Sequence, residues 1–581
     1  MASHWSFLFS MLSPGVRRTL GWVAVWGVVA AAGELALLAT LGRFLRLLDG
    51  TAVDGDSLVA GAARQLDGLG LGSAASVGLM TVLCAFGANW ARVHSLWASA
   101  RFAQEAGADL CSGLFQRVLA QPYSYFARVG SSEVVSAIGL LGRVASSALL
   151  PLAQSIVAGF TVLSLSVSIV LISWEFAAVA LAVVGGAYLL VALVARRRVI
   201  ANSRASAASL VERDACMLES LGGIRDVMLG NLQAATEAEF RQSEQAFRRP
   251  LIANALWNNA PRWFLEAVSI SLIVVMALTL TSGAGDRSDG LGELAVLAVA
   301  SLRLIPNLQR LYGAWGRLMA STGAVEQSAH VLRSHATGPP EALPADVDPS
   351  RADQAFDRIQ CQGLSFRYPG ANGEVFRGVD LEIPRGAAVG LMGATGSGKS
   401  TLADLLMGLQ EPTEGSILIG DQPLEGHLVW DWRACIAHVP QTIHLWDGSF
   451  TENIALGVPP DEVDMERVVE AAKLACAHEF IEESPEGYRS TVGERGARLS
   501  GGQRQRIGLA RALYREALIL VLDEATSALD EATERQVMEN LKASSNGRTL
   551  IIIAHRLSTL ESCDALLEVG EGKVRPAADA R

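Results

Sequence analysis

The residue run GATGSGKST at positions 393–401 constrains the fold of this chain more than any other part of its sequence. The apolar run AAVGLM directly before it predicts a buried strand, and leucines recur at helical spacing directly after it. Strand, glycine-rich loop and helix in this order are the context of a phosphate-binding loop. The glycines let consecutive backbone N–H groups face an anion, and the helix N-terminus adds its positive dipole end. We therefore expect the chain to bind a nucleoside triphosphate.

The residue types within this loop have chemical reasons to be there. Lys399 can reach the β- and γ-phosphates, and the Ser400 hydroxyl can ligate Mg²⁺. A glycine-rich turn that binds nothing is the alternative, but lysine followed by serine has no packing role at such a turn. The candidate ATP-binding residues of this segment are Gly393, Thr395, Gly396, Ser397, Gly398, Lys399, Ser400 and Thr401.

The apolar residues of the chain are unevenly distributed. A chain of 581 residues is too long for a single core, and its hydrophobic content of 50% is high for a soluble enzyme. Long apolar runs crowd residues 1–320, a proline-containing stretch without such runs follows at 321–356, and residues 357–581 have an ordinary globular composition. The net charge of −11 argues against a nucleic-acid partner, and seven well-separated cysteines predict reduced thiols.

Six segments of the first part are apolar and long enough to be membrane-span candidates. Arginines at 17–18, 196–198 and 248–249 fall on one side of these spans, and aspartates fall on the other, which predicts that both termini are cytoplasmic. The six predicted spans are residues 19–41, 77–97, 145–173, 174–195, 264–281 and 291–311.

Two long polar stretches connect these spans, at residues 98–143 and 196–262. Both are rich in helix-forming residues, so we expect helices that continue into the cytoplasm. Each is expected to turn at a short connection, near residues 121–126 and near Gly222. Exposed connecting helices are one interpretation, and we favour helices that transmit force to the nucleotide-binding part.

Charged residues inside predicted spans are costly and therefore mark functional or paired positions. Arg303 and Arg310 are seven residues apart in the sixth span, which places them on one helix face about 10 Å apart. They either pair with acids such as Glu34 or Glu266, or form a cationic surface for an anionic cargo. The candidate cargo residues are Glu34, Arg262, Arg303 and Arg310.

In the second part, short apolar strands alternate with helices, which predicts an α/β fold. The apolar run at 519–522 ends in Asp523 and Glu524. An aspartate at the end of a buried strand beside the phosphate loop suits Mg²⁺ coordination, and the adjacent glutamate suits polarisation of an attacking water. Tyr368, which precedes the loop, can stack on adenine.

The sequence LSGGQ at 499–503 resembles the signature of ATP-binding-cassette (ABC) proteins. Other elements of that family stand in the expected order around it: Gln441 matches the glutamine loop, GERG at 493–496 a segment of exporters, SALD at 527–530 the D-loop, and His555 the switch histidine. The resemblance thus predicts a multidomain chain, with an all-α six-helix transmembrane domain followed by an α/β P-loop ATPase (ABC) domain.

The resemblance also implies a mechanism. In this family two cassettes pack head to tail, and each ATP lies between the phosphate loop of one and the signature of the other. A chain with one cassette and six spans resembles a half-transporter, and its intact motifs favour a homodimer in the inner membrane. The resemblance implies Glu524, His555 and Gln441 as catalytic residues, and Ser400, Gln441 and Asp523 as the Mg²⁺ site. The nucleotide contacts implied beyond the phosphate loop are Tyr368, Ser500, Gly501, Gly502, Gln503 and Asp530.

The cargo is inferred from the membrane half. Within ABC exporters this half is similar to the bacterial flippase for lipid-linked oligosaccharides, through Pro261 and Arg262, Glu34, and the two arginines around Pro306. The likeness implies an anionic pyrophosphate headgroup as cargo. It does not place Arg92 of the second span in the cavity. An exporter of drugs, peptides or lipid A is the alternative, and an ATP-gated channel or regulator is a third hypothesis.

Overall fold

The computed structural model describes residues 9, 11–48, 73–126, 128–172, 174, 178–179, 181–282, 287–333, 346–371, 373–544, 547–554, 556–561 and 563–577. The chain divides into two compact units. The first comprises Met1–Gln121 and Tyr125–Glu341, and the second comprises Pro122–Ser124 and Ala342–Arg581.

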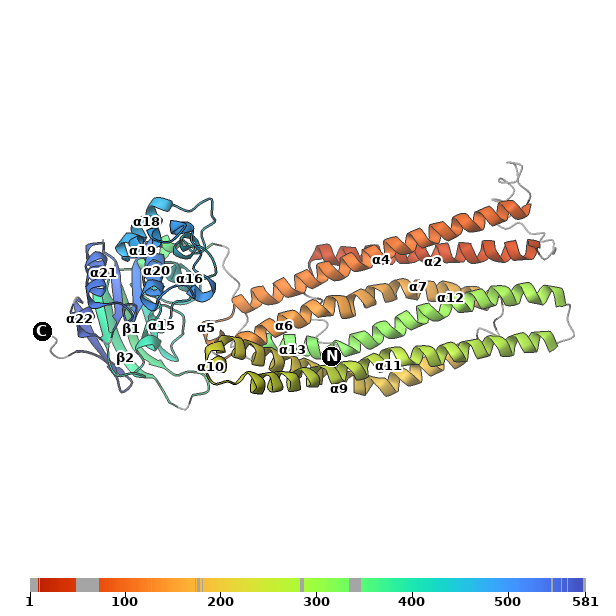
Figure 1. Ribbon diagram of the computed structural model, residues 1–581, viewed down its shortest axis with the longest axis horizontal. Helices are drawn as coiled ribbons and strands as arrows, with labels where there is room; N and C mark the ends of the chain where they lie inside the picture. Colours follow the sequence, from red (N-terminus) through yellow and green to blue (C-terminus); the bar gives the residue numbers. More distant parts are fainter. Residues whose placement is uncertain are drawn as a thin grey trace. The chain divides into compact units, whose positions relative to one another are not determined.

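Most of the described residues of the first unit are helical, and its long helices run side by side (Figure 1). Helix α2 packs against α4 and α7, α7 packs against α12, and α9 pairs with α11. The elements from the N-terminus onward are α2 (Pro14–Leu48), α4 (Ser73–Leu119), α5 (Tyr123–Phe126), α6 (Ser131–Val144), the π-helical turn η1 (Ala145–Leu149), α7 (Leu150–Ile172), the π-helical turn η2 (Leu181–Gly185), α9 (Gly186–Gly222), α10 (Ile224–Leu229), α11 (Gln233–Ser282), α12 (Arg287–Ala320) and α13 (Thr322–Arg333).

Three helical stretches among the described residues are long and apolar enough to cross a membrane: Pro14–Phe44, Ala74–Leu119 and Ser132–Val170. They contain the first two predicted spans and most of the third. The fifth and sixth predicted spans lie within α11 and α12, and the fourth overlaps η2 and α9. Six spans therefore remain the prediction from the sequence.

The predicted continuation of the spans as long polar helices is confirmed. Helix α4 runs from the second predicted span to Leu119, and the short helix α5 follows at the first predicted turn. Helix α9 ends at Gly222, so the second turn also lies where the glycine pair indicated. The glycines end this helix because Gly223 leaves the helical conformation while its N–H still bonds to Glu219 O.

The predicted linker at 321–356 contains two helices. Helix α13 packs against α6 and α9, and the approach to α9 is close: a Cβ added at Gly323 would lie 2.3 Å from Ser203 O. Helix α14 (Pro349–Ala355) belongs to the second unit and begins with an Asp348 cap that accepts from Ser350 N. A cap followed by proline at the first helical position is a helix-start signal, which the interpretation as a linker overlooked.

The second unit contains two β-sheets and the helices around them. One sheet is antiparallel, in the order β2-β1-β4-β5, and the other has the order β10-β9-β3-β8-β7-β6. The strands are β1 (Arg358–Phe366), β2 (Phe376–Pro384), β3 (Ala388–Met392), β4 (Glu414–Ile419), β5 (Gln422–Pro423), β6 (Ile436–Val439), β7 (Ile519–Asp523), β8 (Thr549–Ile553), β9 (Ala565–Gly570) and β10 (Lys573–Pro576). The helices after α14 are α15 (Lys399–Leu406), α16 (His427–Ala434), α17 (Phe450–Ile454), α18 (Met465–Leu474), α19 (His478–Glu482), η3 (Gly487–Arg489), η4 (Glu494–Gly496), α20 (Gly501–Tyr514), α21 (Glu531–Ala543) and α22 (Leu557–Leu560).

The order of the parallel strands brings the motif loops together. Strand β8 lies between β3 and β7, and it is parallel to both. The carboxyl ends of parallel strands meet at one edge of a sheet, so the segments after β3, β7 and β8 converge there. These segments are the phosphate loop, Glu524 and the stretch that contains His555.

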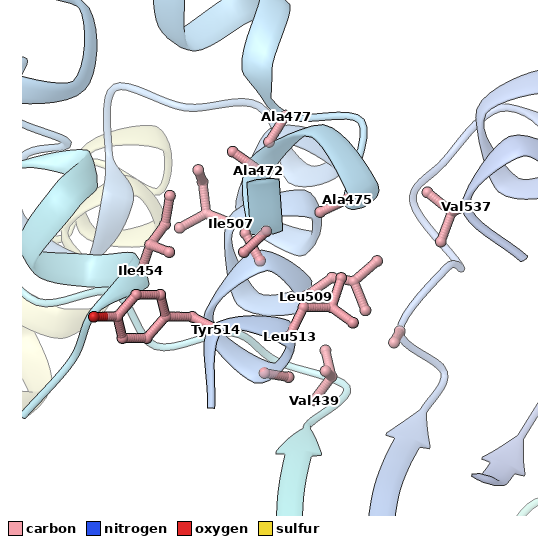
Figure 2. Close-up of a cluster of buried hydrophobic side chains, with 14 of the residues drawn as sticks. Val439, Ile454, Ala472, Ala475, Ala477, Ile507, Leu509, Leu513, Tyr514 and Val537 are labelled. Atoms are coloured by element: carbon pink, nitrogen blue, oxygen red, sulfur yellow. The ribbon is translucent and has the colours of Figure 1, made fainter. Parts of the chain in front are cut away.

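Helix α20 is anchored in an apolar core. Figure 2 shows Ile507, Leu509 and Leu513 of this helix among side chains from β6, α17, α18 and α21. Ile507 is fully buried, as are Val439 and Val537 from other elements. Burial of a large aliphatic side chain contributes about 1.5–3 kcal/mol, so this core fixes the helix that presents the LSGGQ segment.

Candidate functional site

The phosphate loop has the predicted context, because β3 leads into it and α15 follows it. Two of its glycines are required by the backbone. Gly393 has φ of 147°, and a Cβ there would lie 2.2 Å from Val569 O. Gly398 has φ of 104°, and a Cβ there would lie 2.9 Å from a Val375 side-chain carbon. Any L-residue with a side chain would disturb the loop at both positions.

Polar groups of the loop fit a phosphate ligand. Lys399 is buried, and its Nζ donates to Gly393 O and Ala394 O, each at 2.9 Å. The buried Ser397 Oγ has no hydrogen-bond partner among the described residues, and a buried orphan hydroxyl is a group that a ligand would satisfy. Thr395, Gly396 and Ser400 are exposed, so the rim of the loop is accessible.

Glu524 follows β7 in a strained conformation. Its φ is 48°, which is uncommon for a residue with a side chain, and its N–H donates to Ile553 O at 2.9 Å. Gln441, which follows β6, is exposed, and its Nε2 donates to Glu524 Oε2 at 2.7 Å. The strain is maintained by the bond to β8, and such strain is typical of functional positions. The structure thus brings two of the predicted catalytic residues into contact.

The acidic side chains near this sheet edge influence one another. Burial raises the pKa of Asp404 on α15 to about 6, and the negative charge of Asp523 adds to the shift. Burial also lowers the pKa of His438 on β6, and Asp523 opposes that change. Asp523 therefore lies within electrostatic range of the helix that follows the phosphate loop, where a divalent cation would be stabilised.

Tyr368 lies beside the phosphate-binding helix. Its hydroxyl lies 2.9 Å from Thr401 Oγ1, and its ring packs edge-to-face on Phe366 with a centroid distance of 4.9 Å. The ring is thus held in place from two sides, which suits a stacking surface for a nucleobase. The stacking role itself remains a prediction.

The LSGGQ segment begins helix α20 with a capping box. Ser500 Oγ accepts from Gln503 N at 3.2 Å, and Gln503 Oε1 accepts from Ser500 N at 2.9 Å. Ser500 and Gly501 are exposed, whereas Gly502 approaches the D-loop, where a Cβ would lie 2.9 Å from Ala528 O. Gln503 and Asp530 therefore have structural roles: Asp530 caps α21 by accepting from Thr533 N at 3.0 Å.

Sequence reasoning missed the residues that hold the D-loop. Gln505 of α20 is buried, donates to Ser527 Oγ at 3.0 Å and accepts from Ala528 N at 2.9 Å. Glu534 of α21 is 4% exposed and accepts from Thr526, Arg556 and Thr559. The position of Glu534 in the sequence, shortly after the SALD motif, does not predict these hydrogen bonds, because the residues that donate them lie in separate segments of the chain.

These contacts connect the segments around the catalytic edge. Burial acts to raise the pKa of Glu534, but hydrogen bonds from Thr559, Arg556 and Thr526 outweigh it and lower the pKa. Arg556 Nη1 also donates to Leu529 O at 3.4 Å, so the D-loop is bound to the residue that follows His555. His555 itself lies outside the described residues.

A second site lies in the first unit, where residues of α2, α4, α7 and α12 line a partly open cavity of about 330 Å³. Polar side chains line much of its wall: Asn89, Arg92, Gln154, Thr161, Asn307 and Arg310. Arg92 belongs to the second predicted span, so the expectation that no arginine of this span lies in the cavity is wrong. The depth of Arg92 could not be read from the sequence, because it depends on how α2 and α4 align.

The four predicted cargo residues do not all line this cavity. Arg310 lines it and donates to Asn307 Oδ1 at 3.3 Å. Glu34 is 1% exposed and accepts from both Arg92 and Arg303. Arg303 thus forms the structural pair with Glu34, and Arg310 faces the space. Arg262 lies in α11, and its side chain lies outside the described part of the structure.

Known protein families match both parts of the chain. A family model described as ABC transporter matches residues 376–527, and a model described as ABC transporter transmembrane region matches residues 23–302. The lipid A-core flippase of Cupriavidus metallidurans is 32% identical over 475 residues, which cover 79% of this chain and 77% of that protein.

The chain belongs to the ABC transporter family.

As an ABC transporter with one membrane domain and one ATPase domain, it is a half-transporter that hydrolyses ATP. The lipid A-core flippase of Chromohalobacter salexigens is 35% identical over 359 residues, but this chain spans only 60% of that relative's length. A solved structure of a bacterial Atm1-family ABC exporter with ATP bound has a TM-score of 0.79 at 24% identity, and covers 96% of this chain and 94% of that one. This likeness shows that the transporter has the same fold.

Proposed function

We propose that this ABC transporter is an ATP-driven flippase that moves a phosphorylated glycolipid out of the cytoplasmic leaflet of the inner membrane, working as a homodimer with cytoplasmic termini. The observation that carries the proposal is the cavity of the membrane half, which Arg92 and Arg310 line. Guanidinium groups bind phosphate through charge-assisted and often bidentate hydrogen bonds.

Two cargo chemistries fit this cavity, and they share a feature. The relatives are named for flipping the lipid A-core, which supports a lipid cargo. The membrane half resembles a lipid-linked oligosaccharide flippase around Arg303 and Arg310, and this resemblance supports a lipid pyrophosphate as the cargo. Both cargoes are lipids with a phosphorylated sugar headgroup. The headgroup would lie against the arginines, and the acyl or prenyl chains would remain near the exposed apolar faces of α4.

The nucleotide site supplies the driving force. ATP would bind with its phosphates on the loop after β3, and the Tyr368 ring would contact the adenine. Ser400, Asp523 and Gln441 would hold Mg²⁺, which neutralises charge on the phosphates. Glu524 would orient and polarise the attacking water. Gln441 donates a hydrogen bond to the Glu524 carboxylate, so the two side chains are in direct contact. His555 would be the switch histidine.

The homodimer is supported by exposed surfaces of the single chain. Ser500 and Gly501 lie at the N-terminus of α20 and are exposed to solvent. There they can complete the set of hydrogen-bond donors around the ATP phosphates that a second copy binds. Around α10, Leu221, Met228 and Leu229 are 62%, 61% and 83% exposed. Apolar side chains gathered at one turn of a cytoplasmic helix pair are typical of a protein contact, and we assign them to a second copy.

Reconstitution tests the proposal. Vesicles with purified transporter receive a fluorescent lipid A or a fluorescent lipid-pyrophosphate oligosaccharide, and flipping is measured with a membrane-impermeant quencher. We expect ATP to accelerate the flipping of at least one of them. Transport of a neutral hydrophobic drug with no movement of either lipid would instead support the broad exporter. An ATP-dependent ion current without lipid movement would support the channel.

A further inference from the structure

Glu34 occupies an unusual position beside the cavity. It lies in α2 and is 1% exposed, and its two carboxylate oxygens accept from two different helices. Arg92 of α4 donates to Oε1, and Arg303 of α12 donates to Oε2. One buried carboxylate thereby holds three helices together through charge-assisted hydrogen bonds.

The charges of this cluster do not cancel. Arg92, Arg303 and Arg310 carry three positive charges, and Glu34 carries one negative charge. Arg310 is bound to the amide oxygen of Asn307, and among the described residues it forms no salt bridge with a carboxylate. The sum is two uncompensated positive charges beside a cavity with an apolar surround.

The arginines keep donors for a ligand. A guanidinium has five N–H donors, and Arg92 uses Nη2 for Glu34 and Nη1 for Asn89. The Arg92 side chain is 41% exposed, so part of the group faces the cavity. Glu34 therefore orients Arg92 without covering it.

We propose that Glu34 is the internal counter-ion that sets the charge of the headgroup site, so that the cavity selects lipids whose headgroup carries two negative charges over lipids with one. This inference rests on the proposed function, because it assumes an anionic lipid as cargo. Glu34 acts through the arginines and does not contact the cargo, so it is a specificity-determining residue.

The physical reason is charge balance in a medium of low dielectric constant. A dianionic headgroup neutralises the two excess charges, whereas a monoanion leaves one positive charge desolvated. Removing the Glu34 charge raises the excess to three, and removing one arginine lowers it to one. A unit charge at this range is expected to change binding by about ten-fold or more.

The test measures the concentration of lipid that half-maximally stimulates ATP hydrolysis. Monophosphorylated lipid A, whose phosphomonoester carries close to two negative charges at pH 7, is compared with its phosphate methyl ester, which carries one, in vesicles of otherwise neutral lipid, so that only the headgroup charge differs. The wild-type transporter is expected to require less of the lipid with the free phosphate. In Glu34→Gln the preference for the more charged lipid is expected to grow about ten-fold, with a steeper dependence on salt. In Arg310→Gln it is expected to shrink.

A double variant separates charge from structure. Glu34→Gln with Arg303→Gln removes one charge of each sign and restores an excess of two, so the wild-type preference should return. Glu266→Gln removes the same charge from an exposed position of α11 and should leave the preference unchanged. A purely structural Glu34 would weaken stimulation by both lipids equally, so the ratio between the two lipids would stay at the wild-type value in the single and in the double variant.

The outcomes distinguish the two proposals. A wild-type transporter stimulated by neither lipid, and flipping neither, contradicts the proposed function. A stimulated wild type whose lipid preference is the same in Glu34→Gln and Arg310→Gln overturns the role of Glu34 alone. If Glu34→Gln does not yield folded protein, Arg310→Gln still decides, because it changes the excess charge without touching the buried carboxylate.

Discussion

Gln441 donates a hydrogen bond of 2.7 Å to the carboxylate of Glu524, across two loops that follow neighbouring strands of the sheet. This hydrogen bond positions the side chain of a residue whose backbone is already held in the left-handed region. A glutamate fixed in this way can orient a water molecule without rearrangement during the reaction.

Replacement of Glu524 by Gln should therefore stop turnover but preserve ATP binding. General-base catalysis contributes on the order of 10²–10⁴-fold, so kcat should fall by that factor. Steady-state ATP hydrolysis and equilibrium binding of a fluorescent ATP analogue measure the two properties separately. A variant that hydrolyses ATP at the normal rate would remove Glu524 from this role.

Lys399→Ala should weaken ATP binding. In the structure Lys399 Nζ is buried against two loop carbonyls, and a phosphate would take over these bonds. Losing charge-assisted hydrogen bonds to phosphate costs about 3 kcal/mol, or about 100-fold in Kd. Lys473→Ala removes a lysine from the exposed end of α18 and is the matched control. Equal nucleotide affinity in both variants would contradict the assignment.

Tyr368 gives a test of nucleobase stacking. Tyr368→Phe keeps the ring and loses only the contact with Thr401 Oγ1, whereas Tyr368→Ala loses the ring. Stacking of a base on an aromatic ring is worth about 1–3 kcal/mol, so the Ala variant should bind ATP about ten-fold more weakly. The Phe variant should bind nearly as the wild type does. Titration calorimetry measures both, and an Ala variant with wild-type affinity would exclude the stacking role.

Glu534→Gln tests whether the D-loop must be held in place. The change removes the charge that binds Arg556 but keeps the shape, so ATP binding should persist while kcat falls several-fold. Leaving a buried group without its charged partner costs about 1–3 kcal/mol of unfolding free energy. Glu531→Gln, at an exposed position of the same helix, should change neither property.

The stability effect of Glu534 should depend on pH. Its pKa is lowered in the folded protein, because hydrogen bonds to the carboxylate outweigh the effect of burial. Its contribution is complete above the unfolded-state pKa of about 4.3, and it is lost as the pH falls from there through the lowered pKa. The Tm difference between the wild type and Glu534→Gln should thus be largest near pH 7 and shrink below pH 4. A constant difference would contradict this account.

The sequence predicted those parts of the fold and sites that depend on local patterns. The strand, loop and helix around Lys399 are present, and Asp523 ends a buried strand as expected. Both turns of the long polar helices also lie where they were expected, near residues 121–126 and near Gly222. In each case the residues that determine the element lie close together in the sequence, so the local sequence pattern is sufficient to predict it.

The remaining features depend on contacts between distant residues. Arg92 and Glu34 are 58 residues apart, and their pairing follows from how far α2 and α4 are offset along their axes. Glu534 is 25 residues from Thr559, and its hydrogen bonds exist only once β8 lies beside β7. Hydrophobic periodicity reports neither the axial offset of two helices nor the order of strands in a sheet, so the pairings of Arg92 with Glu34 and of Glu534 with Thr559 were not predicted.

The central claim is that ATP hydrolysis at the Glu524 site moves a phosphorylated glycolipid across the membrane. Its most direct measurement is the flipping of fluorescent lipid A and of a lipid-pyrophosphate oligosaccharide in vesicles, with the wild type and Glu524→Gln side by side. We expect ATP-dependent flipping of at least one lipid by the wild type, and none above protein-free vesicles by the variant. Wild-type protein that hydrolyses ATP but flips neither lipid faster than Glu524→Gln would contradict it.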